Sequence, residues 1–244
     1  MLVRSILSRY TPCDVSDALV QFGVKNGGYL PNLIKRSALS TTQSTVGQAY
    51  TVLYAPIDDP RPAIKQSYID EVPSSSVVVV ALPELQQMVS APYVTVNNAL
   101  YGGLMLTRAS YKKASGTVVF GRIRDLSEHR ELNFPVWLYG VGSTAPGPVV
   151  KVVGINVPVL VKVADISGTG FQSILINPGD FMVADENGVV RLPIGHTEGP
   201  EAQIDLDKVL EYIPKRVNAD TKVSEDIKNG VPAAEAQKYW RSKI

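Results

Sequence analysis

The stretch that decides the fold is SVVVVAL, residues 76–82, an uninterrupted apolar run that ends at Pro83. Branched residues such as valine favour extended backbone, and a run without polar alternation is typical of a strand covered on both faces. Working outward, residues 46–55 are rich in Val, Tyr, Thr and Leu and predict a strand before this run. Residues 117–120 and 135–139 predict two short apolar strands after it.

Helical patterns separate these strands. We expect a short helix at residues 63–72, a second at residues 97–114 interrupted by two glycines, and a third at residues 126–132. A first helix is expected from Pro12 to about Gly23, because Thr11 can cap it and Asp14 lies three residues further on. The alternation of strands and helices favours a mixed α/β layer structure over an all-β sandwich.

The second half of the chain changes character. Strands are expected at residues 149–153, 157–164, 181–184 and 189–192, with the pair Asn187-Gly188 as a hairpin turn. After Pro200 the chain becomes polar and helical, and residues 220–244 predict a terminal amphipathic appendage. The expected organisation is therefore one layered domain with a helical extension.

Composition excludes several classes of partner. The 244 residues include 24 Lys+Arg, 23 Asp+Glu, two His and one Cys, and the net charge of +1 gives no footprint for nucleic acid or an anionic membrane. The region 149–166 contains two lysines and a proline, so we expect no membrane span and a cytoplasmic protein. Two histidines leave little material for a zinc site, so any metal is expected to be oxygen-ligated. The lone Cys13 is interpreted as a buried small hydrophobe.

Gly102-Gly103-Leu104-Met105 is the first candidate site. Two glycines inside a helix cost about 1 kcal/mol each relative to alanine, which suggests that the backbone itself is needed there. If the helix begins at these glycines, its free N–H groups can bind a carboxylate. The alternative is close helix packing with Asn97 or Asn98 as the true cap, and the residues alone favour that alternative.

Gly121-Arg122-Ile123-Arg124-Asp125, at the end of the strand predicted at residues 117–120, is the second candidate. Ligands of α/β sheets gather beyond the carboxyl ends of strands, where arginine can bind a carboxylate and aspartate can bind Mg²⁺ or Mn²⁺. Alternatively, Asp125 caps the following helix, with Glu128 completing a capping box. On the residues alone, the cap is the better interpretation.

Other motifs give weaker evidence for a functional site. Pro178-Gly179-Asp180 and the acidic pair before Asn187-Gly188 are interpreted as structural turns. Gly140-Val141-Gly142 follows a strand, but the prolines after it prevent the helix that a dinucleotide site needs. The histidines His129 and His196 stand alone in the sequence.

Several stretches, in order over about three quarters of the chain, resemble the family of regulator of ribonuclease activity A and the class II, metal-dependent 4-hydroxy-4-methyl-2-oxoglutarate aldolases. The matching stretches are Thr11-Pro12, VSDAL at residues 15–19, VGQAYTV at 46–52, YGGLM at 101–105, GRIRDL at 121–126, and PGD at 178–180 through Ala184-Asp185 to Gly188-Val189-Val190. The resemblance implies a compact α/β sandwich of the swivelling β/β/α type over residues 1–200. Residues 201–244 would form a C-terminal helical extension, packed on the same domain or on a neighbouring subunit.

The resemblance also implies a lyase that cleaves carbon–carbon bonds of small 2-keto acids through a pyruvate enolate. In that interpretation Arg124 binds the keto acid and Asp125 holds Mg²⁺ or Mn²⁺ together with waters. Gly102, Gly103, Leu104 and Met105 form the cradle for the substrate carboxylate. The family assembles as trimers or dimers of trimers, so a homotrimer or a dimer of trimers is expected. With the family in view, Arg124 and Asp125 are predicted to be site residues rather than a cap.

One departure from the family pattern concerns Gly103, where the family aldolases carry an aspartate. Aldol cleavage requires a base for the C4 hydroxyl, whereas decarboxylation of oxaloacetate does not. We therefore expect decarboxylation to survive better than aldol cleavage, unless water or an acidic residue such as Glu198 or Glu201 of a neighbouring subunit substitutes. The rival hypotheses are a non-catalytic regulator, as in the ribonuclease inhibitors of the same fold, and a retired enzyme kept for assembly.

Overall fold

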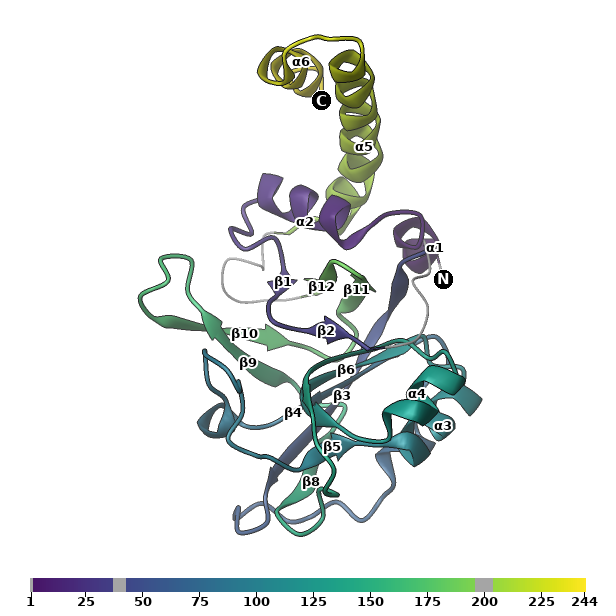
Figure 1. Ribbon diagram of the computed structural model, residues 1–244, viewed down its shortest axis with the longest axis vertical. Coiled ribbons are helices and arrows are strands. Elements are labelled where there is room, and N and C mark those ends of the chain that lie inside the picture. Colours follow the sequence, from purple (N-terminus) through teal and green to yellow (C-terminus); the bar gives the residue numbers. More distant parts are fainter. Residues whose placement is uncertain (1, 37–42, 196–203) are drawn as a thin grey trace.

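The computed structural model describes residues 2–36, 43–195 and 204–244 (Figure 1). Its strands are β1 (Tyr29–Leu30), β2 (Ile34–Lys35), β3 (Thr45–Pro56), β4 (Val77–Ala81), β5 (Ala99–Tyr101), β6 (Gly116–Ile123), β7 (Val136–Val141), β8 (Val150–Ile155), β9 (Val159–Ala164), β10 (Phe171–Ile176), β11 (Phe181–Asp185) and β12 (Gly188–Leu192). Its helices are α1 (Leu2–Leu7), α2 (Pro12–Gln21), α3 (Gly103–Tyr111), α4 (Leu126–Glu131), α5 (Leu206–Lys228) and α6 (Ala233–Arg241), with 3₁₀ turns at Tyr68–Asp70 and Glu84–Gln86.

Four parallel strands form the centre of the main sheet. β3, β4, β6 and β7 lie side by side in that order, β5 pairs with β6 in parallel, and the antiparallel strands β11 and β12 extend the sheet beyond β3. Every residue of β4 is buried, which confirms the strand predicted from residues 76–82. The parallel order also means that these strands all end at one edge of the sheet.

The alternation of side chains along β4 divides the core into two layers. Val78 and Val80 face a cluster that includes Leu106 and Ala109 of α3. Val77 and Val79 face a second cluster built with β9 and β10, which form their own antiparallel ribbon. Figure 1 shows α3 and α4 on one side of the parallel strands and β9–β10 on the other. A strand buried on both faces needs a packed layer on each side, and the helices α3 and α4 and the ribbon β9–β10 are these two layers.

The start of the chain packs on the β11–β12 hairpin. α2 begins with the predicted capping box, since Thr11 accepts from Asp14 N and the Asp14 carboxylate accepts from Thr11 N. A third apolar cluster joins α1 and α2 to β11, β12 and the first half of α5. The hairpin predicted at Asn187-Gly188 is confirmed, with Asp185 paired opposite Gly188.

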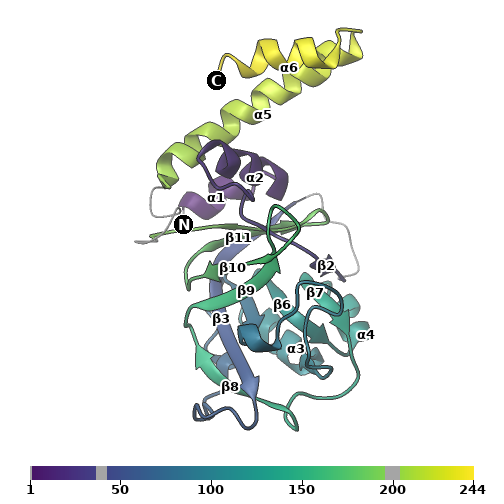
Figure 2. The same ribbon diagram turned by 90° about the vertical axis from the view of Figure 1, so that its left-hand side faces the viewer.

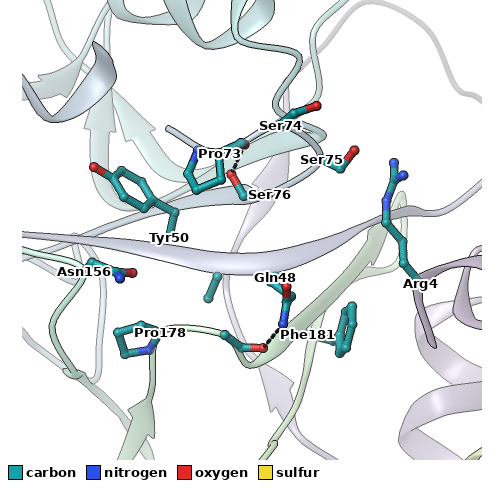
Figure 3. A pocket seen from close by; sticks show the side chains of 12 residues that line it. Arg4, Gln48, Tyr50, Pro73, Ser74, Ser75, Ser76, Asn156, Pro178 and Phe181 are labelled. Atoms are coloured by element: carbon teal, nitrogen blue, oxygen red, sulfur yellow. Dashed lines mark hydrogen bonds between the residues drawn. The ribbon is translucent and has the colours of Figure 1, made fainter. Parts of the chain in front are cut away.

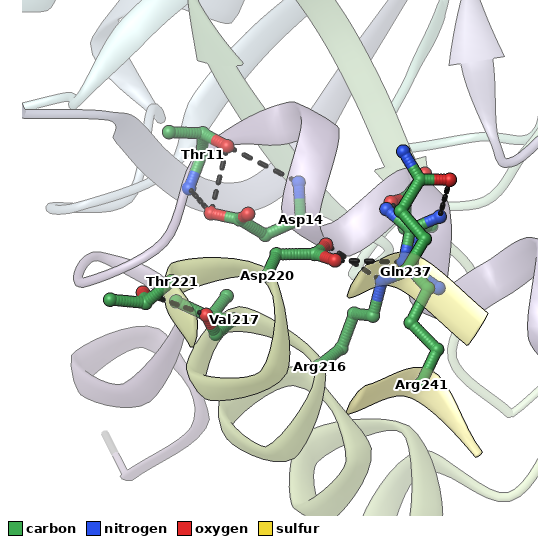
Figure 4. A network of polar contacts seen from close by, with 9 residues as sticks. Thr11, Asp14, Arg216, Val217, Asp220, Thr221, Gln237 and Arg241 are labelled. Atoms are coloured by element: carbon green, nitrogen blue, oxygen red, sulfur yellow. Dashed lines mark hydrogen bonds and ion pairs between the residues drawn. The ribbon is translucent and has the colours of Figure 1, made fainter. Parts of the chain in front are cut away.

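The two C-terminal helices form an arm that leads away from the sheet (Figures 1 and 2). Figure 4 shows how charges fix it: Arg216 of α5 pairs with Asp220 one turn later and with Asp17 of α2, at 2.8 and 3.1 Å. Arg241 of α6 reaches the same Asp220 at 2.8 Å and so ties α6 back on α5. Within the described residues, no helix is both long enough and apolar enough to cross a bilayer.

Taken together, the layers confirm the predicted α/β fold with C-terminal helices, but several boundaries were wrong. The helix expected at residues 97–114 is instead β5 followed by α3, and the one expected at 63–72 shrinks to a single 3₁₀ turn. β10 was not predicted. The helices predicted after Pro200 are confirmed, since α5 begins at Leu206. Cys13 is exposed rather than buried, because it lies on the outer face of α2.

Candidate functional site

The site begins where two neighbouring parallel strands end. Tyr101, the last residue of β5, is in register with Ile123, the last residue of β6. The residues that follow, Gly102 and Arg124, therefore emerge together at the carboxyl edge of the sheet. The amide of Arg124 donates to the carbonyl of Tyr101 at 3.0 Å, and this bond holds the ends of β5 and β6 together. This is the edge at which α/β sheets place their ligands.

Helix α3 starts at this edge without a side-chain cap. Gly102 is the N-cap residue, and Leu106 N donates to its carbonyl at 3.1 Å. The helix thus begins at the glycines, and the alternative with Asn97 or Asn98 as its cap is wrong. The Gly103 amide donates to Asp125 Oδ2 at 3.0 Å, whereas the amides of Leu104 and Met105 have no acceptor among the described residues. Two N–H groups at the positive end of a helix are left for a ligand.

Asp125 does not cap the helix that follows it. It stands at the N-cap position of α4 with φ 62° and ψ 46°, and its side chain makes no bond to that helix. The capping interpretation from the sequence is therefore wrong at this position. A left-handed conformation is costly for a residue other than glycine. Here it directs the carboxylate across to α3, where Oδ2 lies 3.0 Å from Gly103 N and 3.5 Å from Arg124 Nε.

The two glycines leave room for the charged side chains. A Cβ on Gly102 would lie 2.9 Å from Asp125 Oδ2 and 3.1 Å from Arg124 Nε. A Cβ on Gly103 would overlap the carboxylate of Glu128. The side chains of Arg124 and Asp125 remain 37% and 35% exposed, so both are accessible to a small ligand. The one sequence signal for Glu128 is its spacing from Asp125, which is the spacing of a capping box.

A buried histidine lies behind the site. His129 of α4 is fully buried against the ring of Tyr101, with 6.0 Å between ring centroids. Neither ring nitrogen has a hydrogen-bond partner among the described residues. Burial lowers the pKa of His129 below its usual value of 6.5, and the nearby backbone of Arg124 and the charge of Asp125 oppose this only in part. The imidazole therefore belongs to the support of the site in its neutral form.

A metal ion at this edge would have few protein ligands. In the part of the chain that the structure describes, no three His, Cys, Asp or Glu side chains gather into a group able to hold a metal. Asp125 and Glu128 offer carboxylate oxygens only. That donor set does not fit a closed zinc site, but it fits Mg²⁺ or Mn²⁺, which commonly keep several waters and take one or two carboxylates.

A hollow of about 740 Å³ lies at the opposite end of the parallel strands, where these strands begin (Figure 3). Ser74–Ser76 line it before β4 begins, and Gln48 and Phe181 line it from the starts of β3 and β11. Arg4 also borders it, and its guanidinium binds Val46 O and Ser115 Oγ. The hollow thus lies at the amino ends of the parallel strands and is separate from Arg124 and Asp125.

The other acidic candidates are structural, as the sequence indicated. Asp180 is buried in an ion pair with Arg191, and Asp185 accepts from the Asn187 amide at 2.7 Å inside the hairpin turn. Glu198 and Glu201, considered above as substitute bases, lie outside the described residues, as does His196.

Comparisons with known proteins match most of the chain. The family model RraA-like, described as Aldolase/RraA, matches residues 12–191. The chain is 29% identical over 188 residues to a protein of Halalkalibacterium halodurans named "Putative 4-hydroxy-4-methyl-2-oxoglutarate aldolase", covering 77% of this chain and 74% of that protein. It is also 29% identical over 182 residues to the protein DlpA of Legionella pneumophila. That match covers 74% of this chain but only 26% of DlpA, so the chain spans about a quarter of that relative's length.

Solved structures show the same fold at lower identity. An uncharacterized protein from Pseudomonas syringae superposes with a TM-score of 0.72 at 24% identity, covering 96% of both chains. RraAS2 of Streptomyces coelicolor, described as an unusual member of the RNase ES inhibitor RraA family, superposes with a TM-score of 0.62 at 23% identity. That match covers 93% of this chain and 96% of the other. Together these structures extend the likeness to the C-terminal helices.

Proposed function

The chain belongs to the RraA-like family, Aldolase/RraA, and from this premise we propose that it is a divalent-metal-dependent lyase acting on small 2-keto acids. The reactions are oxaloacetate decarboxylation, aldol cleavage of 4-hydroxy-4-methyl-2-oxoglutarate, or both, through a pyruvate enolate. The relative named as an aldolase supports this choice. The observation that carries it is the position of Asp125, whose carboxylate leaves its own helix and joins Arg124 beside the open start of α3.

The substrate carboxylate is bound by the backbone and by Arg124. The free amides of Leu104 and Met105 point out of the positive end of α3 and suit an anion. The Arg124 guanidinium adds a fixed positive charge and several donors, which orient a keto acid in one plane. The positive charge of the guanidinium also stabilises the negative charge that develops on the enolate.

Asp125 is the proposed anchor for Mg²⁺ or Mn²⁺. Gly103 N fixes one carboxylate oxygen, so the rest of the carboxylate faces the site in a set orientation. When bound, the cation supplies Lewis acidity for the keto oxygen. The chain's own contribution is to orient that carboxylate and to keep Arg124 beside it.

We further propose a homotrimer or a dimer of trimers, with the layered domain of residues 1–200 as the catalytic unit. The resemblance to the family supports this assembly, and so does the open position of the site, which leaves space for a neighbouring subunit. Light scattering after size exclusion measures the mass directly. A single chain of 26.4 kDa in solution would contradict the proposal.

The test is pyruvate release from oxaloacetate, with Mg²⁺ or Mn²⁺ and then with chelator. Asp125→Ala is expected to lower the metal-dependent rate by at least about 100-fold, because an electrostatic contact made in the transition state is lost. Asp165→Ala, in the turn between β9 and β10, is the matched control and should keep the parent rate.

A parent rate no higher than the uncatalysed background would contradict the lyase and would favour a non-catalytic regulator of the same fold. An Asp125→Ala variant that keeps full metal-dependent turnover, with an unchanged melting temperature, would contradict the role of Asp125 as the metal anchor.

A further inference from the structure

We propose that Glu128 is the base for aldol cleavage and supplies, from α4, the carboxylate that Gly103 cannot supply from α3. This inference rests on the proposed function and deepens it, because it decides which of the two reactions the site can perform. It also replaces the expectation that aldol cleavage is the weaker reaction in a chain with glycine at position 103.

The position of Glu128 is the first observation. It lies in the first turn of α4, three residues after Asp125, yet its side chain reaches across to α3. A Cβ on Gly103 would overlap its carboxylate, so this group occupies the space where any side chain at position 103 would begin. Gly103 is therefore not a gap in the site, because a carboxylate from the next helix fills it.

The freedom of this carboxylate is the second observation. The Asp125 carboxylate contacts Gly103 N and Arg124 instead of capping α4. Because no capping box forms at the start of α4, Glu128 has no capping role there. Among the described residues, no hydrogen bond or ion pair engages either oxygen of Glu128. An unpaired carboxylate at the start of α3, against Gly103, is available to accept a proton from a bound ligand.

The proposed step is a retro-aldol cleavage. Glu128 accepts the proton of the C4 hydroxyl, and the O–H electron pair becomes the new C=O bond. The C3–C4 bond breaks, and its electron pair forms the C2=C3 bond of the pyruvate enolate, with the charge on the keto oxygen beside the Arg124 guanidinium. The proton held by Glu128 then adds to C3, directly or through water, so that the Glu128 carboxylate is regenerated and one hydroxy keto acid gives pyruvate and a second carbonyl compound.

Decarboxylation needs no such base. When oxaloacetate loses CO₂, the electron pair of the breaking bond forms the same enolate, and no hydroxyl proton is removed. Glu128 thus contributes to one reaction far more than to the other. The ratio of the two rates reports its role even if all activity falls through a general defect.

The experiment compares Glu128→Gln with Glu131→Gln, a matched control in the last turn of the same exposed helix. Both are assayed with 4-hydroxy-4-methyl-2-oxoglutarate and with oxaloacetate, and Mn²⁺ binding is titrated by calorimetry without substrate. Glu128→Gln should lower the ratio of aldol cleavage to decarboxylation by about 100-fold, the usual contribution of a general base. Mn²⁺ affinity should stay within about threefold, and Glu131→Gln should match the parent in every assay.

A relocated carboxylate sharpens the test. In Gly103→Asp/Glu128→Ala, the new side chain enters the space that Glu128 vacates. This double variant should recover the ratio to within about tenfold of the parent, whereas Glu128→Ala alone should not. Rescue by a carboxylate on a different helix is not expected if Glu128 only stabilises α4.

The outcomes separate the two proposals. If the parent catalyses neither reaction, the lyase proposal fails and this inference fails with it. If the parent decarboxylates oxaloacetate but cleaves no aldol, or if Glu128→Gln leaves the ratio unchanged, only the role of Glu128 is overturned. An equal loss of both reactions together with Mn²⁺ binding would also overturn it, since Glu128 would then be a metal ligand.

Discussion

Two of the Arg–Asp pairs in the molecule, Asp180 with Arg191 and Asp125 with Arg124, differ in almost every physical respect. Asp180 and Arg191 lie 3.3 Å apart with side chains 0% and 1% exposed. Arg124 and Asp125 lie 3.5 Å apart with side chains 37% and 35% exposed. The first pair is enclosed beside the β11–β12 hairpin, and the second stands at the carboxyl edge of β5 and β6.

The surroundings of the buried pair give it several further hydrogen-bond partners. Asp180 accepts from the amides of Asn177 and Ile194, each at 2.9 Å, and Arg191 donates to Leu175 O at 2.6 Å. Charges removed from water need such partners, since desolvation would otherwise outweigh their attraction. The buried pair therefore contributes to the structure of the hairpin and offers nothing to a ligand.

The open pair has the opposite character. Asp125 has one backbone partner, and its distance from Arg124 is at the long end for an ion pair. Exposed pairs of this kind contribute only about 0–1 kcal/mol to stability. Their side chains stay free to bind a ligand. The same two residue types therefore contribute to the structure where they are buried and stay available to a ligand where they are exposed.

The largest expected effect is on the buried pair. Asp180→Asn should lower the free energy of unfolding by about 3–5 kcal/mol, because the charge of Arg191 is then buried without its counter-charge. Asp125→Asn, the matched change in the open pair, should lower it by less than about 1 kcal/mol. Urea unfolding followed by circular dichroism measures both. Equal losses for the two variants would mean that burial does not distinguish the pairs.

The next effect concerns Arg124 and is seen in kinetics. Arg124→Lys keeps the charge but replaces a planar fork of donors by a point charge, so the keto acid loses orientation. We expect kcat/KM for oxaloacetate to fall about tenfold, equivalent to about 1.4 kcal/mol. The melting temperature should hardly change. A variant with full kcat/KM would show that only the charge of Arg124 matters.

Local patterns predicted the core well and the site only in part. The valines of β4 admit one interpretation, because an apolar run of that length must be covered on both faces. The start of α3 was ambiguous, since residues 97–114 have helical spacing and only the parallel pairing of β5 with β6 makes the first part a strand. Local secondary-structure propensity cannot predict this pairing, because the partner strand lies more than a dozen residues away in the sequence.

The positions of the Asp125 and Glu128 side chains could not be predicted from the sequence, for a related reason. Their spacing is that of a capping box, and local rules favour the cap. The left-handed backbone at Asp125 turns the carboxylate toward α3 instead, and this conformation is imposed by the contacts between two strand ends. The resemblance to a family singled out Arg124 and Asp125, but nothing in the sequence alone indicates that Glu128 reaches Gly103.

The smallest expected effect concerns His129, the buried group behind the open pair. Burial lowers its pKa below the value of 6.5 that it has when exposed, so between these two pKa values the unfolded chain binds more protons than the folded one. Stability is therefore fully present above pH 6.5 and falls as the pH drops toward the folded pKa. His129→Leu cannot take up this proton, so its melting temperature should fall less than the parent's between pH 7.5 and 5.5, by a few degrees at most. The carboxylates titrate in both proteins and cancel in the difference. Equal pH dependence in the parent and the variant would mean that water reaches the imidazole and that the site is open behind the pair as well as in front of it.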